Sequence, residues 1–304
     1  MLVAFKVRRS YPMRVCFFRS DKPREGILAD AFMEGVKKHG DIASIRMLGD
    51  EDESDHCDVA VMVGVKSKRL FDKHINAGRH VIYLDKGYSR HVSEDSAVRI
   101  WEYWRVSVDS HHPTRYLMLK QMPHDRIDAF GLDLPLPPLR KGGNLSHIVI
   151  AGSSAKYHEF YGMKPPNEYY KKVFKQIREK SAQPVIYRPK PSYHDAESIP
   201  GTITSPSRES IYDVLDGAHA LVTHGSNACF EAVITGVPCI ILGDAVAKPI
   251  SSTDLKFIRS PKLASEEDRM QWLANLSYQQ WTMPEMKNGK AWDHIRPMIF
   301  GEFR

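Results

Sequence analysis

The segment from residue 220 to residue 244, ALVTHGSNACFEAVITGVPCIILGD, restricts the possible fold more than any other part of the sequence. Residues 220–223 form a short apolar run, as expected of a buried parallel strand. A glycine-containing turn follows, and Ser226 or Asn227 can cap the helix that starts there. Residues 236–238, Gly-Val-Pro, end that helix before a second apolar run. The segment therefore predicts a βαβ unit.

The turn of this unit is suited to anion binding. Gly225 permits a tight turn or a close approach of the backbone to a ligand. A helix N-terminus directs unpaired N–H groups and its dipole at such a ligand. Glu231 follows Asn227 by one helical turn, and its carboxylate could accept hydrogen bonds from ribose hydroxyls. An ordinary βαβ unit with a capped helix is the alternative.

The pattern H-G-S-N-A-x-x-E-A-x-x-x-G-V-P-x-I at residues 224–240 resembles the nucleotide-sugar half of GT-B glycosyltransferases. Related epimerases and capsule-polysaccharide transferases are similar. The resemblance implies an α/β fold of two Rossmann-like, doubly wound domains that face a cleft. It implies that the donor diphosphate is bound at the Gly/Ser turn and the ribose at Glu231. The donor-binding residues expected here are His224, Gly225, Ser226, Asn227 and Glu231.

The length of 304 residues exceeds one ordinary hydrophobic core, so two domains are expected. In the first half, apolar runs at residues 14–18, 42–47, 58–65 and 80–84 alternate with helical patterns, which predicts a parallel sheet. A Pro- and Gly-rich linker at residues 132–143 separates the halves. We expect an acceptor domain at 1–138, a nucleotide-sugar domain at 144–275, and C-terminal helices at 276–304 that pack back on the first domain, as GT-B chains commonly do.

Composition restricts the cellular locations and the binding partners that are expected for this protein. No apolar run approaches the roughly 20 residues of a membrane span, and Lys6, Arg8 and Arg9 interrupt the apolar start that a signal peptide needs. We therefore expect a cytoplasmic protein without a membrane partner. The four cysteines lack CxxC spacing and are expected to be buried free thiols. A net charge of +6 permits a polyanionic partner such as DNA but does not require one.

Three residues of the first half are candidates for the catalytic base. Asp21 lies in the loop after the first predicted strand, at the sheet edge where open α/β sheets bind ligands. Asp109 and His111 follow the strand at residues 104–108, and a carboxylate beside imidazoles suits general-base chemistry. If the reaction inverts, one of these groups would deprotonate the acceptor hydroxyl. The alternative for residues 109–113 is a polar loop whose histidines only hydrogen-bond nearby backbone.

The sequence predicts no metal site. The acidic stretch at residues 50–55 contains the Asp-x-Asp pattern of GT-A enzymes, but a solvated turn is favoured because a second Rossmann-like half follows. His111 and His112 have no third ligand at zinc spacing. We expect no cofactor other than a nucleotide-sugar co-substrate, with a UDP-sugar first.

Further donor contacts are expected after two strands of the second half. Residues 147–151 form a strand that enters a small-residue turn without P-loop spacing, and the resemblance places that turn, Gly152, Ser153 and Ser154, at the donor phosphates. Prolines fix Arg188 and Lys190 at another strand end. This R-P-K-P element resembles the R-P-H-P or K-P-H-P of capsule-type transferases, with Lys190 at the usual His. Both cations would stabilise the leaving diphosphate in place of a metal.

The loop after residue 243 is the expected sugar or acceptor side, because it often has that position in GT-B enzymes. Its candidate residues are Asp244, Lys248, Ser252 and Thr253. A surface loop is the alternative. The tail at residues 265–294 is rich in tryptophan, which predicts core packing or, alternatively, a surface for stacking flipped bases.

The acceptor is inferred from resemblance alone. The segments RVSVDSHHPT, YRPKPS, THGSNACFEA, GDAVAKPISST and YQQWTMPEM resemble uncharacterised proteins of tailed bacteriophages, some of which glycosylate hydroxymethylated bases of their own DNA. This implies double-stranded DNA with modified bases as a partner and the host cytoplasm as the location. A capsule, lipopolysaccharide or small-molecule glycosyltransferase, an epimerase, and a non-catalytic nucleotide- or glycan-binding module are the alternatives.

Overall fold

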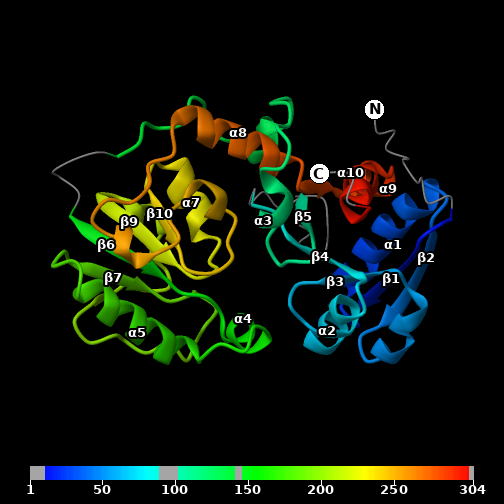
Figure 1. The fold of residues 1–304 in the computed structure, drawn as a ribbon, viewed down its shortest axis with the longest axis horizontal. Helices are drawn as coiled ribbons and strands as arrows, with labels where there is room; N and C mark the ends of the chain where they lie inside the picture. Colours follow the sequence, from blue (N-terminus) through cyan, green and yellow to red (C-terminus); the bar gives the residue numbers. More distant parts are fainter. Residues whose placement is uncertain (1–10, 89–101, 141–145, 301–304) are drawn as a thin grey trace, which may run out of the picture.

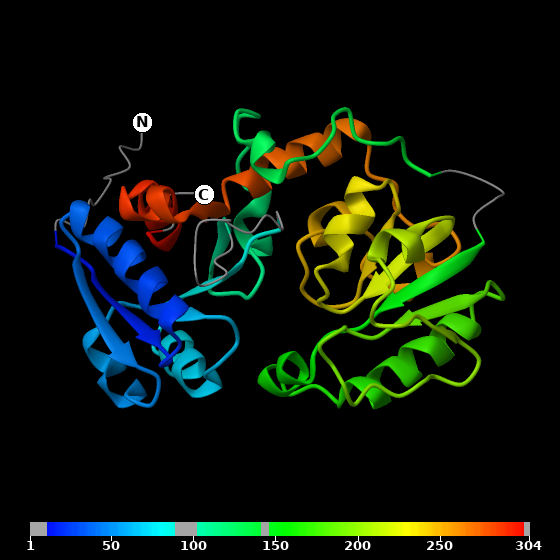
Figure 2. The same ribbon diagram turned by 180° about the vertical axis from the view of Figure 1, so that it is seen from behind.

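The computed structural model describes residues 11–88, 102–140 and 146–300. The chain forms two α/β halves, each built on its own sheet, and α8 (Glu266–Ser277) runs across the top of both (Figures 1 and 2). Among the helices of these ranges, none has the length and apolar character needed to cross a bilayer.

The sheet of the first half has six strands in the order β11-β5-β4-β3-β1-β2. Four of them pair in parallel, whereas β5 runs antiparallel to β4 and β11 antiparallel to β5. Continuous apolar runs such as VAVMV in β3 are buried on both faces, as parallel strands require. The strands are β1 (Arg14–Arg19), β2 (Ile42–Met47), β3 (Val59–Val63), β4 (His80–Lys86), β5 (Tyr103–Val108) and β11 (Gln280–Thr282).

Helices cover both faces of this sheet. The long helix α1 (Pro23–Lys38) buries Leu28, Phe32 and Val36 at helical spacing. Its neighbours on the same side are α9 (Met283–Lys287) and α10 (Lys290–Ile299), which come from the C-terminal end of the chain (Figure 1). The other face carries α2 (Lys68–Asn76), whose cap Ser67 accepts a hydrogen bond from the backbone N–H of Leu70.

The tail of the chain is therefore part of the first half. The side chains of Trp272, Trp281 and Trp292 are all less than 5% exposed, so the alternative of an aromatic surface for stacking bases is wrong for them. Asp41 joins α10 to the N-terminal strand, because its carboxylate accepts hydrogen bonds from Met13 N, Trp292 Nε1 and Arg296 Nε at 2.8–2.9 Å.

Asp41→Ala is expected to lower the free energy of unfolding by about 3 kcal/mol, since it leaves a guanidinium and two N–H groups without their buried acceptor. Burial acts to raise the pKa of Asp41, but hydrogen bonds from Arg296, Met13 and Trp292 lower it below its ordinary value. The stabilisation is thus present at neutral pH and lost as the pH falls through that lowered pKa. Urea titrations at pH 7 and pH 3 test both points, with the exposed Asp293→Ala, expected to change stability by about 0.5 kcal/mol or less, as control.

The second half contains five parallel strands in the order β10-β9-β6-β7-β8. One face packs on α5 and the other on α6, α7 and α8. The strands are β6 (His147–Ala151), β7 (Val185–Arg188), β8 (Ile203–Thr204), β9 (Ala218–Thr223) and β10 (Cys239–Ile241); the helices are α4 (Ala155–Phe160), α5 (Pro166–Arg178), α6 (Ile211–Leu215) and α7 (Ala228–Ile234). The expected architecture, two doubly wound α/β halves, is confirmed.

The two halves pack against each other through apolar side chains. Phe160 of α4 enters the core of the first half, with ring centroids 5.6 Å from Phe71 and 6.3 Å from Tyr83. The first half in turn packs Tyr88 and Phe130 on Phe230 of α7 in the second half. The ring centroids of these two residues lie 5.5 and 5.4 Å from that of Phe230. These contacts bring the carboxyl ends of both sheets to face one another.

Candidate active site

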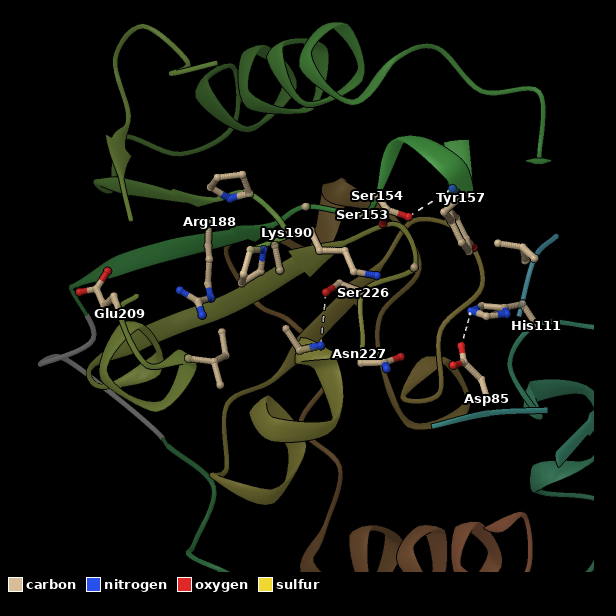
Figure 3. Close-up of a pocket in the computed structure, with 18 of the residues that line it drawn as sticks. Asp85, His111, Ser153, Ser154, Tyr157, Arg188, Lys190, Glu209, Ser226 and Asn227 are labelled. Atoms are coloured by element: carbon tan, nitrogen blue, oxygen red, sulfur yellow. Dashed lines mark hydrogen bonds and ion pairs between the residues drawn. The ribbon is translucent and has the colours of Figure 1, made fainter. Parts of the chain in front are cut away.

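A cleft of about 480 Å³ lies between the two halves. The second half contributes the ends of β6, β7 and β9, and the first half contributes Val65, Asp85, Arg105 and His111. Figure 3 shows Arg188 and Glu209 toward one end of the cleft, Lys190, Ser226 and Asn227 in the middle, and Asp85 with His111 at the other end.

Two cations project from the end of β7. Arg188 donates from Nη1 to Ser205 Oγ at 3.1 Å, and Pro189 and Pro191 flank Lys190. A side chain at Gly152 would come within 3.2 Å of Pro189 Cα, so a glycine lets the β6 turn lie against this segment. Burial by the cleft walls and the charge of Arg105 lower the pKa of Lys190, although Asp85 opposes this effect. Both cations line the cleft.

The Gly152, Ser153 and Ser154 turn also lines the cleft, and part of its polar groups holds the fold together. Ser153 donates its backbone N–H to Tyr170 Oη at 2.9 Å, and Ser154 Oγ caps α4 by accepting from Tyr157 N at 3.3 Å. A hydroxyl that accepts a hydrogen bond can still donate one, so this contact leaves Ser154 able to donate to a ligand.

The turn after β9 contributes three of its four predicted residues. Gly225, Ser226 and Asn227 line the cleft. A Cβ atom at residue 225 would lie 2.5 Å from Tyr157 Oη, which explains the glycine. His224, in contrast, is not among the residues that line the cleft. Its Nδ1 lies 2.8 Å from Tyr169 Oη, and its ring covers Gly243.

Several other predicted residues lie outside the cleft lining. Glu231 is 3% exposed within α7, so the structure does not bring the predicted ribose ligand to the cleft. Asp244 accepts a 2.6 Å hydrogen bond from Ser110 Oγ and so joins the two halves. Lys248 begins the short helix at Lys248–Ile250, Ser252 is buried beside β10, and Thr253 is exposed beyond it.

Of the three predicted catalytic residues, only His111 lines the cleft. Asp21 is exposed after β1. Asp109 lies at the opposite end of β4 from Asp85, where it accepts from Val81 N at 2.9 Å and contacts His80 Nδ1 at 2.9 Å. The reason is the direction of β5, because an antiparallel strand delivers its last residue to the amino end of its neighbour.

The hydrogen bond from Arg105 requires His111 to be a neutral imidazole with a free lone pair on Nε2. Its Nε2 accepts from Arg105 Nη2 at 2.8 Å, and the residue is 9% exposed. Burial, and then the charges of Arg105 and Lys190, hold the pKa of His111 well below its ordinary value. We expect its Cε1–H resonance, assigned with a His111→Gln variant, to show no titration between pH 5.5 and 8. A midpoint within that range would contradict the assignment.

Sequence reasoning missed two residues, Asp85 and Arg105. Asp85 directly follows the predicted strand at 80–84. Asp21 was chosen as a candidate because it, too, follows a predicted strand. Its side chain is 32% exposed, its Oδ1 accepts from Lys86 N at 2.8 Å, and its Oδ2 accepts from Arg105 Nη2 at 3.0 Å. Nothing in the sequence marked Arg105 as a site residue. It alternates with apolar residues along its strand, a pattern that predicts a side chain on the solvent-facing side of the sheet.

The acidic stretch at residues 50–55 lies away from the cleft. Asp52 pairs with Arg69, and Asp55 pairs with Lys73 and Arg79 at 2.9 and 3.0 Å, at the surface beside α2. Within the described ranges, no group of three His, Cys, Asp or Glu side chains is arranged to hold a metal ion.

Comparison with solved structures identifies the architecture. The match with the β-Kdo 2,7 transferase of Thermosulfurimonas dismutans KpsC has a TM-score of 0.53 and a sequence identity of 13%. It covers 91% of this chain and 98% of the transferase chain. The chain has the GT-B fold. The β-Kdo 2,4 transferase of the same protein has a TM-score of 0.49, 11% identity and coverages of 90% and 93%. The S. aureus MnaA complex with UDP has a TM-score of 0.32, 9% identity and coverages of 95% and 97%. Protein-family models and curated protein sequences give no match.

Proposed function

We propose that this GT-B protein is a glycosyltransferase that moves a sugar from a nucleotide-activated donor to a hydroxyl acceptor. The observation that carries the proposal is the arrangement of charge across the cleft. Arg188 and Lys190 lie on the half that carries the nucleotide-sugar motif, and Asp85 faces them from the other half.

In this mechanism the donor phosphate binds beside Arg188, Lys190 and the side chains of Ser226 and Asn227. Asp85 takes the proton of the acceptor hydroxyl, and the acceptor oxygen attacks the anomeric carbon as its bond to the donor phosphate breaks. The nucleotide leaves with the bonding electron pair, and the two cations stabilise its growing charge. His111 is not the base, because Arg105 occupies its one acceptor nitrogen.

Two finer features belong to the proposal. We infer that Arg188 and Lys190 stabilise the negative charge of the leaving nucleotide without a metal ion. The activity should therefore persist in EDTA. For the acceptor, the phage-like segments favour a hydroxymethylated base in duplex DNA, whereas the name of the Kdo transferase KpsC favours a saccharide. The donor is expected among UDP- and TDP-sugars first, and an activated form of Kdo extends the panel.

The decisive experiment measures nucleotide release from UDP-, TDP-, GDP- and ADP-sugars and from nucleotide-activated Kdo. Each donor is offered saccharide acceptors and hydroxymethylated duplex DNA, with and without EDTA. Mass spectrometry of the acceptor identifies the transferred sugar. A mass gain on one acceptor supports the proposal and selects the acceptor class. Donor binding without turnover would replace it with a binding module, and isomerisation of the donor sugar without an acceptor would replace it with an epimerase.

A further inference from the structure

Arg105 is a charged side chain that connects the two walls of the cleft. It projects from β5 and is 1% exposed. Its Nη1 group lies within hydrogen-bonding distance of three acceptors, which are Tyr88 Oη at 3.0 Å, His112 Nδ1 at 3.2 Å and Asn227 Oδ1 at 3.3 Å. Its Nη2 group donates to Asp85 Oδ2 at 3.0 Å and to His111 Nε2 at 2.8 Å. The two amino groups thus contact acceptors from both halves of the protein, with Asn227 as the partner from the second half.

A guanidinium only donates hydrogen bonds, so each partner must present an acceptor to it. The amide of Asn227 therefore points its oxygen at Arg105 and its NH₂ group elsewhere. By the same reasoning, His111 carries its proton on Nδ1 and not on Nε2. One buried side chain accordingly determines the hydrogen-bonding direction of two groups that line the cleft.

We propose that Arg105 is a positioning residue that couples donor binding to acceptor activation. This inference rests on the proposed glycosyl transfer. On the wall that binds the sugar donor, Arg105 orients the amide of Asn227 so that its NH₂ group can donate a hydrogen bond to a phosphate oxygen. On the acceptor side, it holds the carboxylate of Asp85 in place to receive the proton of the acceptor hydroxyl.

The lysine variant separates geometry from charge. Arg105→Lys retains the positive charge, but a single ammonium cannot donate to Asn227 and Asp85 with the geometry of a guanidinium fork. We expect kcat to fall about 100-fold, because small displacements of reacting groups have effects of that size. The KM for the donor should rise several-fold, because the amide of Asn227 is then free to turn.

Arg269→Lys is the matched control. Arg269 is also 1% exposed, but it donates to the backbone oxygens of Val233 and Pro137 at 3.2 and 2.8 Å, away from the cleft. Its replacement should lower the melting temperature by a similar amount without changing kcat at a temperature where both variants are folded. A kcat of Arg105→Lys within threefold of the native value, or equal losses in both variants, would overturn the inference.

A second readout needs no substrate. Nitrogen-15 chemical shifts of His111 should show a protonated Nδ1 and an unprotonated Nε2 in the native protein. In Arg105→Met, the loss of the donor and of its charge should raise the pKa of His111 and mix the two tautomers. A protonated Nε2 in the native protein would refute the assigned direction. If no donor is turned over at all, the proposed function fails, while this spectrum still decides the orienting role of Arg105.

Discussion

Asp85→Asn is expected to reduce kcat by about 10²–10⁴-fold, the range observed when a general base is lost. Asparagine keeps the shape of the side chain and can still accept a hydrogen bond from Arg105, so the cleft should remain intact. Its amide cannot take a proton from the acceptor hydroxyl. Donor affinity, measured by calorimetry, should change by no more than about threefold, since Asp85 lies on the opposite wall from Arg188.

Asp21→Asn provides the control for this prediction. Asp21 also follows a strand of the first sheet, but it is exposed and lies outside the cleft. The kcat of the Asp21→Asn enzyme should stay within about twofold of the native value. Equal activity of the Asp85→Asn enzyme and the native enzyme at saturating donor and acceptor would exclude Asp85 as the base.

Lys190→Met is expected to lower kcat/KM by about 10²–10³-fold, the loss seen when one preorganised group that stabilises transition-state charge is removed. The ammonium is held between two prolines and faces the centre of the cleft, so it is already placed where the leaving phosphate would develop its charge. Lys172→Met removes one charge from the exposed face of α5 and should leave kcat/KM nearly unchanged.

The pH dependence of the same site has a definite sign. Since the pKa of Lys190 is lowered, the ammonium loses its proton at a lower pH than an ordinary lysine. The native enzyme should therefore lose activity on the alkaline side as the pH rises through that lowered pKa. A guanidinium stays charged over this range, so Lys190→Arg should move the alkaline limb to higher pH. An identical limb in both enzymes would assign it to another group.

The sequence was most informative where the signal was local. The apolar run before Gly225, the glycine itself and the Gly-Val-Pro stop identified a βαβ unit because each acts within a few residues. The same holds for Arg188 and Lys190, whose prolines fix them at a strand end.

The position of one predicted catalytic residue, Asp109, depends on long-range geometry, which a local pattern does not contain. A strand pattern does not reveal direction, and the antiparallel course of β5 takes Asp109 to the far end of β4. Nor does it show which cation of an alternating strand is buried, so Arg105 looked like a surface residue. His224 was misplaced for a third reason, because its ring is held over Gly243, a residue of the following turn.

The pairing of β11 with β5 has a consequence for biosynthesis. The second half, residues 146–277, is continuous in the chain, whereas the first half is completed only by residues 280–299. A ribosome takes on the order of ten seconds to translate the about 170 residues between β5 and β11. During that interval β5 has an unpaired edge and α1 an uncovered apolar face. Nascent chains should consequently acquire protease resistance first in the second half, although it is translated later.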